Sequence, residues 1–293
     1  MFKSGFVNIV GNPNVGKSTL MNLLMGERIS IATFKAQTTR HRIMGIINEP
    51  EAQIVFSDTP GVLKPNYKLQ ESMLAFSESA LQDADVLLYV TDVVEKPDKN
   101  SEFLAKVQRL DVPVLVLINK IDLSEQQALE QLVAAWHDTL PAAEVFPISA
   151  KVKFGVEHVL CRIKDLLPDA PPYFDRDQWT DKPARFFVTE IIREKILLYY
   201  DKEIPYAVEV VVEEFHETDS NIHIRALIYC ERESQKGILI GHRGVALKKV
   251  STEARKTLEK FFQKTIYLET VVKVDKDWRQ STRRLEAYGY KQD

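Results

Sequence analysis

Hydrophobic and polar positions alternate between two patterns along the first 167 residues. Short runs rich in valine, isoleucine and leucine predict strands at Phe6–Val10, Ile43–Ile47, Gln53–Ser57, Asp85–Thr91, Val114–Asn119 and Glu144–Ile148. Apolar residues spaced three and four apart predict helices between them, at Lys17–Met25, Lys68–Leu81, Asn100–Leu110, Glu125–Thr139 and Val156–Leu167. Because runs that are apolar at successive positions are typical of strands covered on both faces, we expect an α/β domain with a mostly parallel, six-stranded sheet. The second and third strands, joined by Asn48–Glu51, are expected to form an antiparallel hairpin at one edge.

The pattern changes after a proline-rich stretch. Pro168, Pro171 and Pro172 end the last helix, and the polar residues that follow reach Pro183, so residues 168–183 are predicted to link two domains. In residues 184–293 we expect a helix near Phe187–Leu198, strands Ala207–Phe215 and Asn221–Glu231, an amphipathic helix after Gly244, strand Ile266–Val274 and a last helix, Trp278–Ala287. The two long strands alternate apolar and polar residues, which predicts a smaller α+β domain with one solvated sheet face.

Composition supports two folded domains and leaves few other classes open. The 293 residues are 45% hydrophobic and 28% charged, as in globular proteins. No apolar run approaches the roughly 18 residues needed to span a bilayer, and the first predicted strand leaves no room for a signal peptide. Cys161 and Cys230 fit no metal-ligand spacing, so we expect reduced thiols and a cytoplasmic protein. Peripheral membrane contact stays open, without support from any segment.

A phosphate-binding loop stands between the first predicted strand and helix. Residues 11–18 read Gly-Asn-Pro-Asn-Val-Gly-Lys-Ser and match the G-x(4)-G-K-[ST] pattern. Backbone N–H groups of such a loop surround an anion, and the helix N-terminus adds positive potential. Lys17 is expected to reach the β- and γ-phosphates, and Ser18 to ligate Mg²⁺. With Thr19, the expected nucleotide contacts in this loop are Gly11, Asn12, Pro13, Asn14, Val15, Gly16, Lys17 and Ser18.

The choice of base follows from a second motif. Asn119, Lys120 and Asp122 follow a valine-rich strand as Asn-Lys-x-Asp, and a carboxylate there can accept from both N1–H and the 2-amino group of guanine. Ser149, Ala150 and Lys151 follow the sixth strand and are expected to brace the guanine O6. The motif therefore predicts GTP and disfavours a P-loop kinase or ATPase.

Two more segments are expected near the phosphates. Asp58 ends the third strand within Asp-Thr-Pro-Gly61, so it is placed to hold Mg²⁺ through water while the Gly61 N–H approaches the γ-phosphate. The polar stretch Arg28–Arg42 contains Thr38 and Thr39, and a threonine hydroxyl there would complete the Mg²⁺ shell. An ordinary surface loop is the alternative for this stretch.

Basic residues concentrate in the second domain although the net charge is −3. Residues 236–264 hold eight basic and two acidic residues, which predicts a polyanion site or, alternatively, a solvated helix face. Gly237–Gly244 reads Gly-Ile-Leu-Ile-Gly-His-Arg-Gly, and its G-x-x-G turn resembles that of a K homology (KH) domain of the prokaryotic type. Such a loop admits the backbone of single-stranded RNA. The expected RNA contacts are Gly237, Ile240, Gly241, His242, Arg243, Gly244, Lys248 and Lys249.

Together the motifs and their order resemble the Era-type bacterial GTPases over essentially the whole chain. The resemblance implies hydrolysis of GTP, binding near the 3′ end of small-subunit ribosomal RNA, and a role in assembling the small ribosomal subunit. An RNA-binding assembly factor that uses GTP only as a structural switch, with negligible intrinsic hydrolysis, is the alternative.

Hydrolysis is where this chain departs most from common GTPases. Val62 stands where many carry the glutamine that orients the attacking water, so slow intrinsic turnover is expected. The resemblance implies K⁺ beside the phosphates at Asn14, for which capping of the loop is the alternative. The residues expected to act in hydrolysis are Lys17, Asn14, Thr39 and Gly61. Leu63 and His242 also differ from the family pattern, where histidine and lysine are common.

Overall fold

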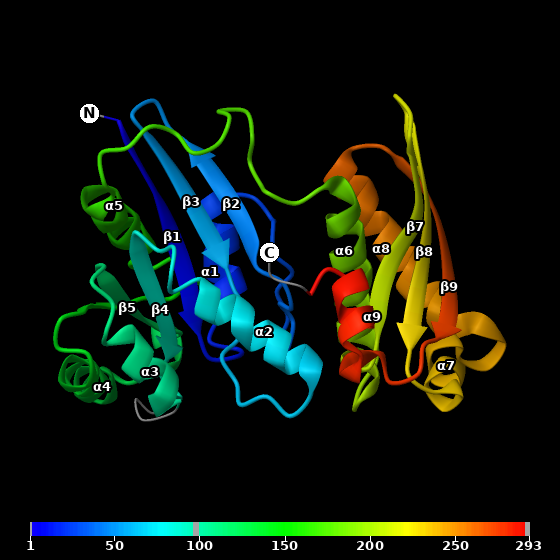
Figure 1. The fold of residues 1–293 in the computed structure, drawn as a ribbon, viewed down its shortest axis with the longest axis horizontal. Helices are drawn as coiled ribbons and strands as arrows, with labels where there is room; N and C mark the ends of the chain where they lie inside the picture. The colour runs from blue at the N-terminus through cyan, green and yellow to red at the C-terminus, as the bar shows by residue number, and fades with distance from the viewer. Residues whose placement is uncertain (1, 96–99, 291–293) are drawn as a thin grey trace. The chain divides into compact units, whose positions relative to one another are not determined.

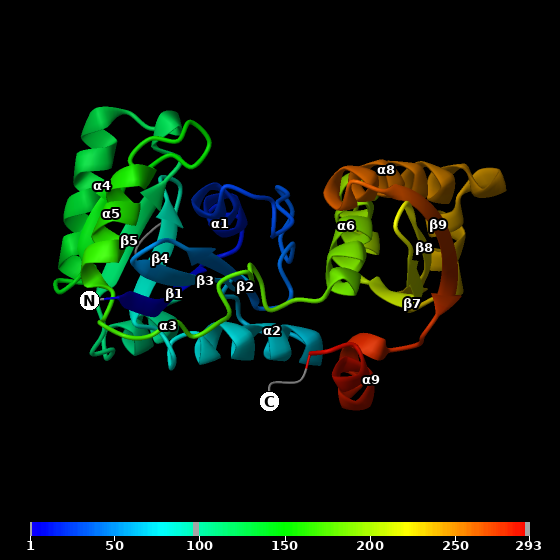
Figure 2. The same ribbon diagram turned by 90° about the horizontal axis from the view of Figure 1, so that it is seen from above.

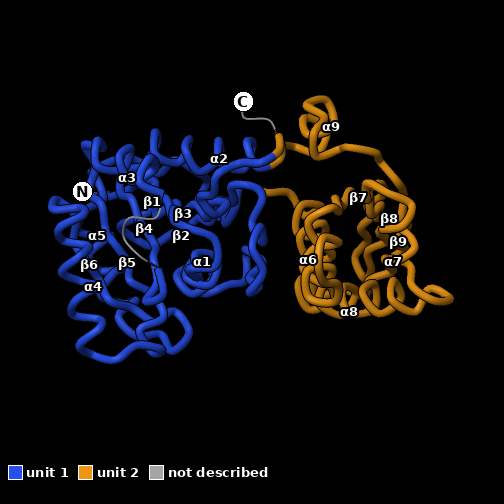
Figure 3. The backbone as a smooth tube through the Cα atoms, turned by 90° about the horizontal axis from the view of Figure 1, so that it is seen from below, with its two compact units in different colours: residues 1–66, 70–181, 292 blue, residues 67–69, 182–291, 293 orange. Residues whose placement is uncertain are grey.

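The computed structural model describes residues 2–95 and 100–290 and divides the chain into two compact units (Figure 3). Of the described residues, one unit comprises 2–66, 70–95 and 100–181, and the other comprises 67–69 and 182–290. Each unit has a hydrophobic core of its own. The domain boundaries expected from the sequence, at residues 167 and 184, stay predictions.

The first unit is built on a six-stranded sheet with the order β2-β3-β1-β4-β5-β6 (Figure 1). Its strands are β1 (Lys3–Gly11), β2 (Ile43–Asn48), β3 (Ala52–Asp58), β4 (Val86–Asp92), β5 (Val114–Asn119) and β6 (Glu144–Pro147). All neighbours pair in parallel except β2 and β3, which form the expected antiparallel hairpin. The mostly parallel α/β sheet predicted from the apolar runs is confirmed.

Helices cover both faces of this sheet, as buried strands require. They are α1 (Lys17–Met25), α2 (Lys68–Ser79), α3 (Ser101–Val107), α4 (Gln126–Thr139) and α5 (Val156–Leu166). Figure 2 shows α1 on one side of the strands and α2 and α3 on the other. On the α2 and α3 side, Tyr89 of β4 packs against the fully buried Trp136 of α4, with ring centroids 5.3 Å apart.

The parallel arrangement brings the motifs to one edge of the sheet. The phosphate loop follows β1, Asp58 ends β3, Asp92 ends β4 and Asn119 ends β5. Ligands of open α/β sheets bind outside the carboxyl ends of the strands. The fold therefore places the candidate nucleotide residues together although they are far apart in sequence.

The end of the proline-rich segment is hydrogen-bonded to β2. Ile46 N donates to Trp179 O (2.9 Å), the Thr180 hydroxyl donates to Met44 O (2.7 Å), and Met44 N donates to an Asp181 carboxylate oxygen (2.9 Å). These residues thus occupy the outer side of β2, an edge strand of the sheet. Residues 178–181 belong structurally to the first unit.

The second unit packs helices against one face of a three-stranded sheet with the order β7-β8-β9. Its elements are α6 (Ala184–Tyr199), β7 (Glu209–Glu217), β8 (Asn221–Cys230), α7 (Glu233–Ile240), α8 (Val245–Phe262), β9 (Thr265–Val274) and α9 (Thr282–Ala287). β7 and β8 are antiparallel, whereas β8 and β9 are parallel. This α+β arrangement with two central helices confirms the KH-type fold.

The prediction of one continuous last helix at Trp278–Ala287 is wrong. A short 3-10 turn spans Trp278–Gln280, and α9 begins only at Thr282, with the Ser281 side chain accepting from Arg284 N. The cause is the Trp278 ring, which is fully buried and donates to Ala207 O (3.0 Å). None of the helices in the described ranges is both long and apolar enough to cross a membrane.

Candidate nucleotide and RNA sites

The phosphate loop depends on two glycines that no other residue can replace without movement. Gly11 has φ 144°, and a Cβ there would lie 2.0 Å from the Val90 carbonyl oxygen. Gly16 has φ 99°, and its Cβ would lie 2.3 Å from the Asn119 amide nitrogen. The loop therefore lies directly against β4 and against the base-recognition motif.

Lys17 lies beneath this loop and is almost completely buried. Its ammonium donates to Gly11 O (3.0 Å) and Asn12 O (2.7 Å). Burial lowers the pKa of Lys17 to about 8, although the nearby Asp58 and Glu95 carboxylates act in the opposite direction. The amine is thus held among neutral loop oxygens, and a phosphate would give it the full negative partner that it lacks.

Three side-chain oxygens meet beside Lys17, from three segments far apart in sequence. The Ser18 hydroxyl donates to Asp58 Oδ2 (2.7 Å) and lies 2.8 Å from the Thr39 hydroxyl. The other oxygen, Asp58 Oδ1, is buried without a hydrogen-bond partner among the described residues, and burial raises the pKa of this carboxyl. Two hydroxyls and a carboxylate are hard oxygen donors, so the set fits Mg²⁺. Thr38 instead turns back to Lys35 O (2.6 Å), which singles out Thr39.

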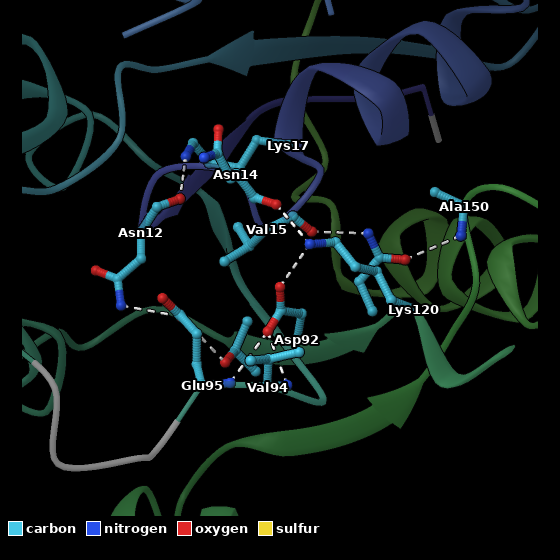
Figure 4. Close-up of polar contacts among 11 residues, drawn as sticks. Asn12, Asn14, Val15, Lys17, Asp92, Val94, Glu95, Lys120 and Ala150 are labelled. Atoms are coloured by element: carbon cyan, nitrogen blue, oxygen red, sulfur yellow. Dashed lines mark hydrogen bonds and ion pairs between the residues drawn. The ribbon is translucent and has the colours of Figure 1, made fainter. Parts of the chain in front are cut away.

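Asn119 joins the guanine-side residues to the phosphate loop. Its amide donates to Val15 O (2.8 Å) and accepts from Ala150 N (2.9 Å). Lys120 Nζ donates to Asn14 O and to Asp92 Oδ2, both at 2.6 Å (Figure 4). The three loops are therefore tied together before any nucleotide contact is made.

Asp122 faces solvent in this region and is hydrogen-bonded to the buried Ser149. The Ser149 hydroxyl, itself buried, donates to Asp122 Oδ1 (2.6 Å), while Asp122 is exposed. Lys151, next along the chain, and Thr19 on α1 are exposed as well. The carboxylate is oriented by one hydrogen bond and keeps lone pairs on both oxygens for the two N–H donors of a guanine base.

Gly61 and Val62 begin the segment after β3. A Cβ on Gly61 would lie 2.6 Å from Pro13 N, so this segment runs directly along the phosphate loop. The Val62 side chain is 5% exposed and packs in the apolar cluster that includes Val10 and Leu81. Valine at this position is thus a core residue, turned away from the nucleotide edge.

The G-x-x-G turn of the second unit lies between α7 and α8. Gly241 has φ 73°, and a Cβ there would lie 2.6 Å from the Ala246 Cβ, while Gly244 has φ 78° and open space around it. Arg243 is also left-handed, with φ 50°, and the side chains of His242 and Arg243 are exposed. Gly237, in contrast, lies inside α7 with nothing near its Cβ position, so its glycine is not demanded by the fold.

Lys248 and Lys249 are both exposed at the start of α8. On one side of α8, the hydroxyls of Ser251 and Thr270 of β9 lie 2.6 Å apart. The same side has an open groove of about 480 Å³, lined by residues of β8 and β9, by Glu214 of β7 and by Arg255. On the other side, Lys249 lies over the ring of Tyr199 in α6.

Comparison with known proteins finds matches to both units of the chain. Residues 6–120 match the family model described as a 50S ribosome-binding GTPase, and residues 203–279 match the KH domain model. The GTPase Era of Geotalea uraniireducens is 44% identical over 291 residues, which cover 99% of this chain and 98% of the relative. The GTPase Era of Clostridium kluyveri is 41% identical over 293 residues, 99% of this chain and all of the relative. The chain belongs to the Era family of GTPases.

Solved Era structures match the complete fold. A crystal structure of Era with MgGDPNP and nucleotides 1506–1542 of 16S ribosomal RNA has a TM-score of 0.94 and 37% identity, covering 99% of both chains. A variant of Aquifex aeolicus Era bound to GDP·AlF₄⁻ has the same TM-score, identity and coverage. As a member of the Era family the chain is a GTPase, which hydrolyses GTP to GDP and phosphate.

The structure adds residues at the nucleotide edge of this Era-family chain that the motifs did not predict. Asp92 anchors Lys120, and Asn12 donates to the Glu95 carboxylate (2.9 Å). Asn100 donates both to the Asn12 side chain and to Val62 O. Only Asp92 had a usable pattern in the sequence, because it ends a buried parallel strand at the nucleotide edge.

Proposed function

We propose that the chain hydrolyses GTP with Mg²⁺ while bound to small-subunit ribosomal RNA near its 3′ end, and acts in assembly of the small subunit in the cytoplasm. The observation that carries this proposal is the full-length likeness to the Era that was crystallised with MgGDPNP and nucleotides 1506–1542. No segment argues for membrane contact.

On the nucleotide side, Ser18, Thr39 and Asp58 would hold Mg²⁺, which supplies positive charge to the transferring phosphoryl group. Lys17 binds the β- and γ-phosphates, and the Gly61 N–H meets the γ-phosphate. Thr39 would respond to the γ-phosphate through the shared Mg²⁺, because its hydroxyl lies 2.8 Å from the Ser18 hydroxyl and donates to Asp58 Oδ2 (3.4 Å).

On the RNA side, the left-handed Gly241 and Gly244 let the phosphate backbone approach α8 closely. The test replaces either glycine with aspartate in the full chain. We expect loss of binding to the 1506–1542 RNA with unchanged GDP affinity, since the two sites lie in separate units. Normal RNA binding by both variants would overturn the proposed RNA site.

The alternative, a GTP switch with negligible intrinsic hydrolysis, differs in one measurement. Turnover of the protein alone is compared with turnover in the presence of the same RNA and of small subunits. A measurable rate without RNA supports the enzyme, whereas a rate that exists only with RNA or subunits supports the alternative.

We also propose K⁺ beside the phosphates at Asn14. Its backbone is left-handed, with φ 66°, and its side-chain amide is exposed. This amide has no hydrogen-bond partner within the described ranges, so no contact supports the alternative that it caps the loop. Its carbonyl oxygen is therefore available to a cation. Turnover is expected to be faster in K⁺ than in Na⁺ at equal ionic strength, and Asn14→Ala to abolish the difference. Equal rates in both salts would exclude the site.

A further inference from the structure

Helices α6 and α8 lie side by side in the second unit (Figures 1 and 2). They run in opposite directions, because Phe187 at the start of α6 contacts Phe261 at the end of α8, with ring centroids 5.1 Å apart. The end of α6 consequently meets the start of α8. Tyr199 and Lys249 face each other there, with the lysine Nζ 4.3 Å from the ring centroid.

Tyr199 is the last residue of α6 and Tyr200 follows it, and their side chains differ in exposure. Tyr200 is buried, and its hydroxyl donates to Leu239 O (2.6 Å), two residues before Gly241. Tyr199 is 39% exposed, and no other ring lies beside it among the ring contacts of the described residues. The Tyr200 bond ties the end of α6 to the last turn of α7, just before the G-x-x-G loop, and so fixes the position of Tyr199 near that loop.

Lysines and their acidic partners line the same side of α8. Lys249, Glu253 and Lys256 are spaced four and three residues apart and share one face. Lys256 donates to Glu253 (2.8 Å) and is the main cause of that carboxyl's lowered pKa, to which Lys195 of α6 and Lys249 also contribute. We call Lys195, Tyr199, Lys249 and Lys256 the α6–α8 seam. It lies on the other side of α8 from the groove beside β9.

We propose that Tyr199 is a positioning residue for RNA binding: its ring face holds the Lys249 ammonium over the α6–α8 seam, where the ammonium meets a phosphate of the bound RNA. This inference rests on the proposed RNA-binding function. It extends the RNA surface from the G-x-x-G loop to a second side of α8, away from the groove.

The physical reason lies in how a ring holds an ammonium group. Attraction between a cation and a ring face needs none of the three N–H donors, so Lys249 can bind a phosphate while it stays over Tyr199. A lysine otherwise loses much rotamer freedom when it binds. The ring removes part of that loss in advance. Lys195 is paired with Glu194 and Lys256 with Glu253, whereas Lys249 has no carboxylate in ion-pair contact among the described residues, so its charge is available to a phosphate.

The test measures affinity for the 1506–1542 RNA as a function of salt concentration. Tyr199→Ala is expected to weaken binding about 2- to 5-fold, the range for an exposed cation–ring contact. Tyr199→Phe keeps the ring and is expected to bind as the native chain does, whereas Tyr199→Leu keeps apolar bulk alone and is expected to behave like the alanine variant. Lys249→Ala is expected to reduce the slope of log affinity against log salt concentration by about 0.7, because one phosphate contact is lost. Tyr199→Ala is expected to reduce the same slope.

Double variants separate positioning from general damage. Tyr199→Ala is expected to add little to Lys249→Ala, because both remove one contact. The matched control is Lys260→Ala, which lies on the same face about 16 Å farther along α8 and whose effect is expected to be additive with Tyr199→Ala. Additive losses for Tyr199 and Lys249, or native binding by Tyr199→Leu, would overturn the proposal. Loss of the proposed function itself is recognised separately, by normal RNA binding in the Gly241→Asp protein.

Discussion

At the scale of single residues, the buried Lys17 ammonium makes the nucleotide site sensitive to pH. Its pKa is lowered from 10.5 to about 8, chiefly by burial. A bound polyphosphate favours the charged amine, so binding raises this pKa and takes up a proton above pH 8. Folding of the nucleotide-free protein responds to pH in the opposite direction. Between pH 8 and 10.5 the unfolded chain binds more protons at Lys17 than the folded chain does, so the free energy of unfolding increases as pH rises.

We therefore expect GDP affinity, measured with Mg²⁺, to fall by up to about tenfold per pH unit above pH 8. Calorimetry in two buffers of different ionisation heat checks the proton uptake directly. Lys17→Arg keeps its charge throughout this range and is expected to lose the pH dependence. A flat profile in the native protein would contradict the assignment.

Asp122 governs base choice at the same scale. The Ser149 hydroxyl orients its carboxylate through one hydrogen bond, and both oxygens keep a lone pair for N1–H and the 2-amino group of guanine. Asp122→Asn replaces a carboxylate acceptor with an amide donor and is expected to lower the affinity for GTP by roughly 10⁴-fold. It is expected to favour xanthine nucleotides, which carry a carbonyl where guanine carries its 2-amino group. Competition between GTP and XTP for a fluorescent GDP checks this. Unchanged GTP affinity would show that the base is recognised elsewhere.

At the scale of elements, the segment after β3 lies so close to the phosphate loop that only glycine fits. A Cβ at Gly61 would come within 2.7 Å of three atoms of Pro13. Gly61→Ala is expected to push the segment away from the γ-phosphate, to slow hydrolysis by roughly 10²-fold and to leave GDP affinity nearly unchanged, since GDP has no γ-phosphate. Single-turnover measurements check the hydrolysis rate, and titration with GDP checks the affinity. Equal losses for GDP and GTP would instead indicate a damaged loop.

The elements also show how far sequence reasoning reached. Apolar runs and fixed motifs predicted the sheet, the hairpin and the convergence of Ser18, Thr39 and Asp58, because each depends on local pattern or on the order of parallel strands. The break at Ser281 was missed, since it depends on where Trp278 is buried. The bonds of Thr180 and its neighbours to β2 were missed too, because an irregular strand-like segment without alternation carries no periodic pattern. Tyr199 could not be singled out because an exposed aromatic is visible only after helices pack.

At the scale of the whole molecule, the two units have separate cores and separate chemistry. Variants in the phosphate loop and in the G-x-x-G loop are therefore expected to have independent effects on folding. Any effect of GTP on RNA affinity must be matched by an equal effect of RNA on the preference for GTP over GDP, because binding linkage is reciprocal.

The segment along β2 has a further consequence, for solubility. An uncovered edge strand offers its N–H and C=O groups to other copies of the chain and is a starting point for intermolecular sheet growth. Trp179, Thr180 and Asp181 form those hydrogen bonds with Met44 and Ile46.

A truncated protein ending at residue 167 would leave the edge open, whereas one ending at 181 would keep it covered. We expect the 1–181 protein to stay monomeric and to bind GDP, and the 1–167 protein to self-associate as its concentration rises, as measured by light scattering. Two equally monomeric proteins would show that β2 needs no cover. If the expectation holds, the segment that leads to the second unit also keeps the first from aggregating.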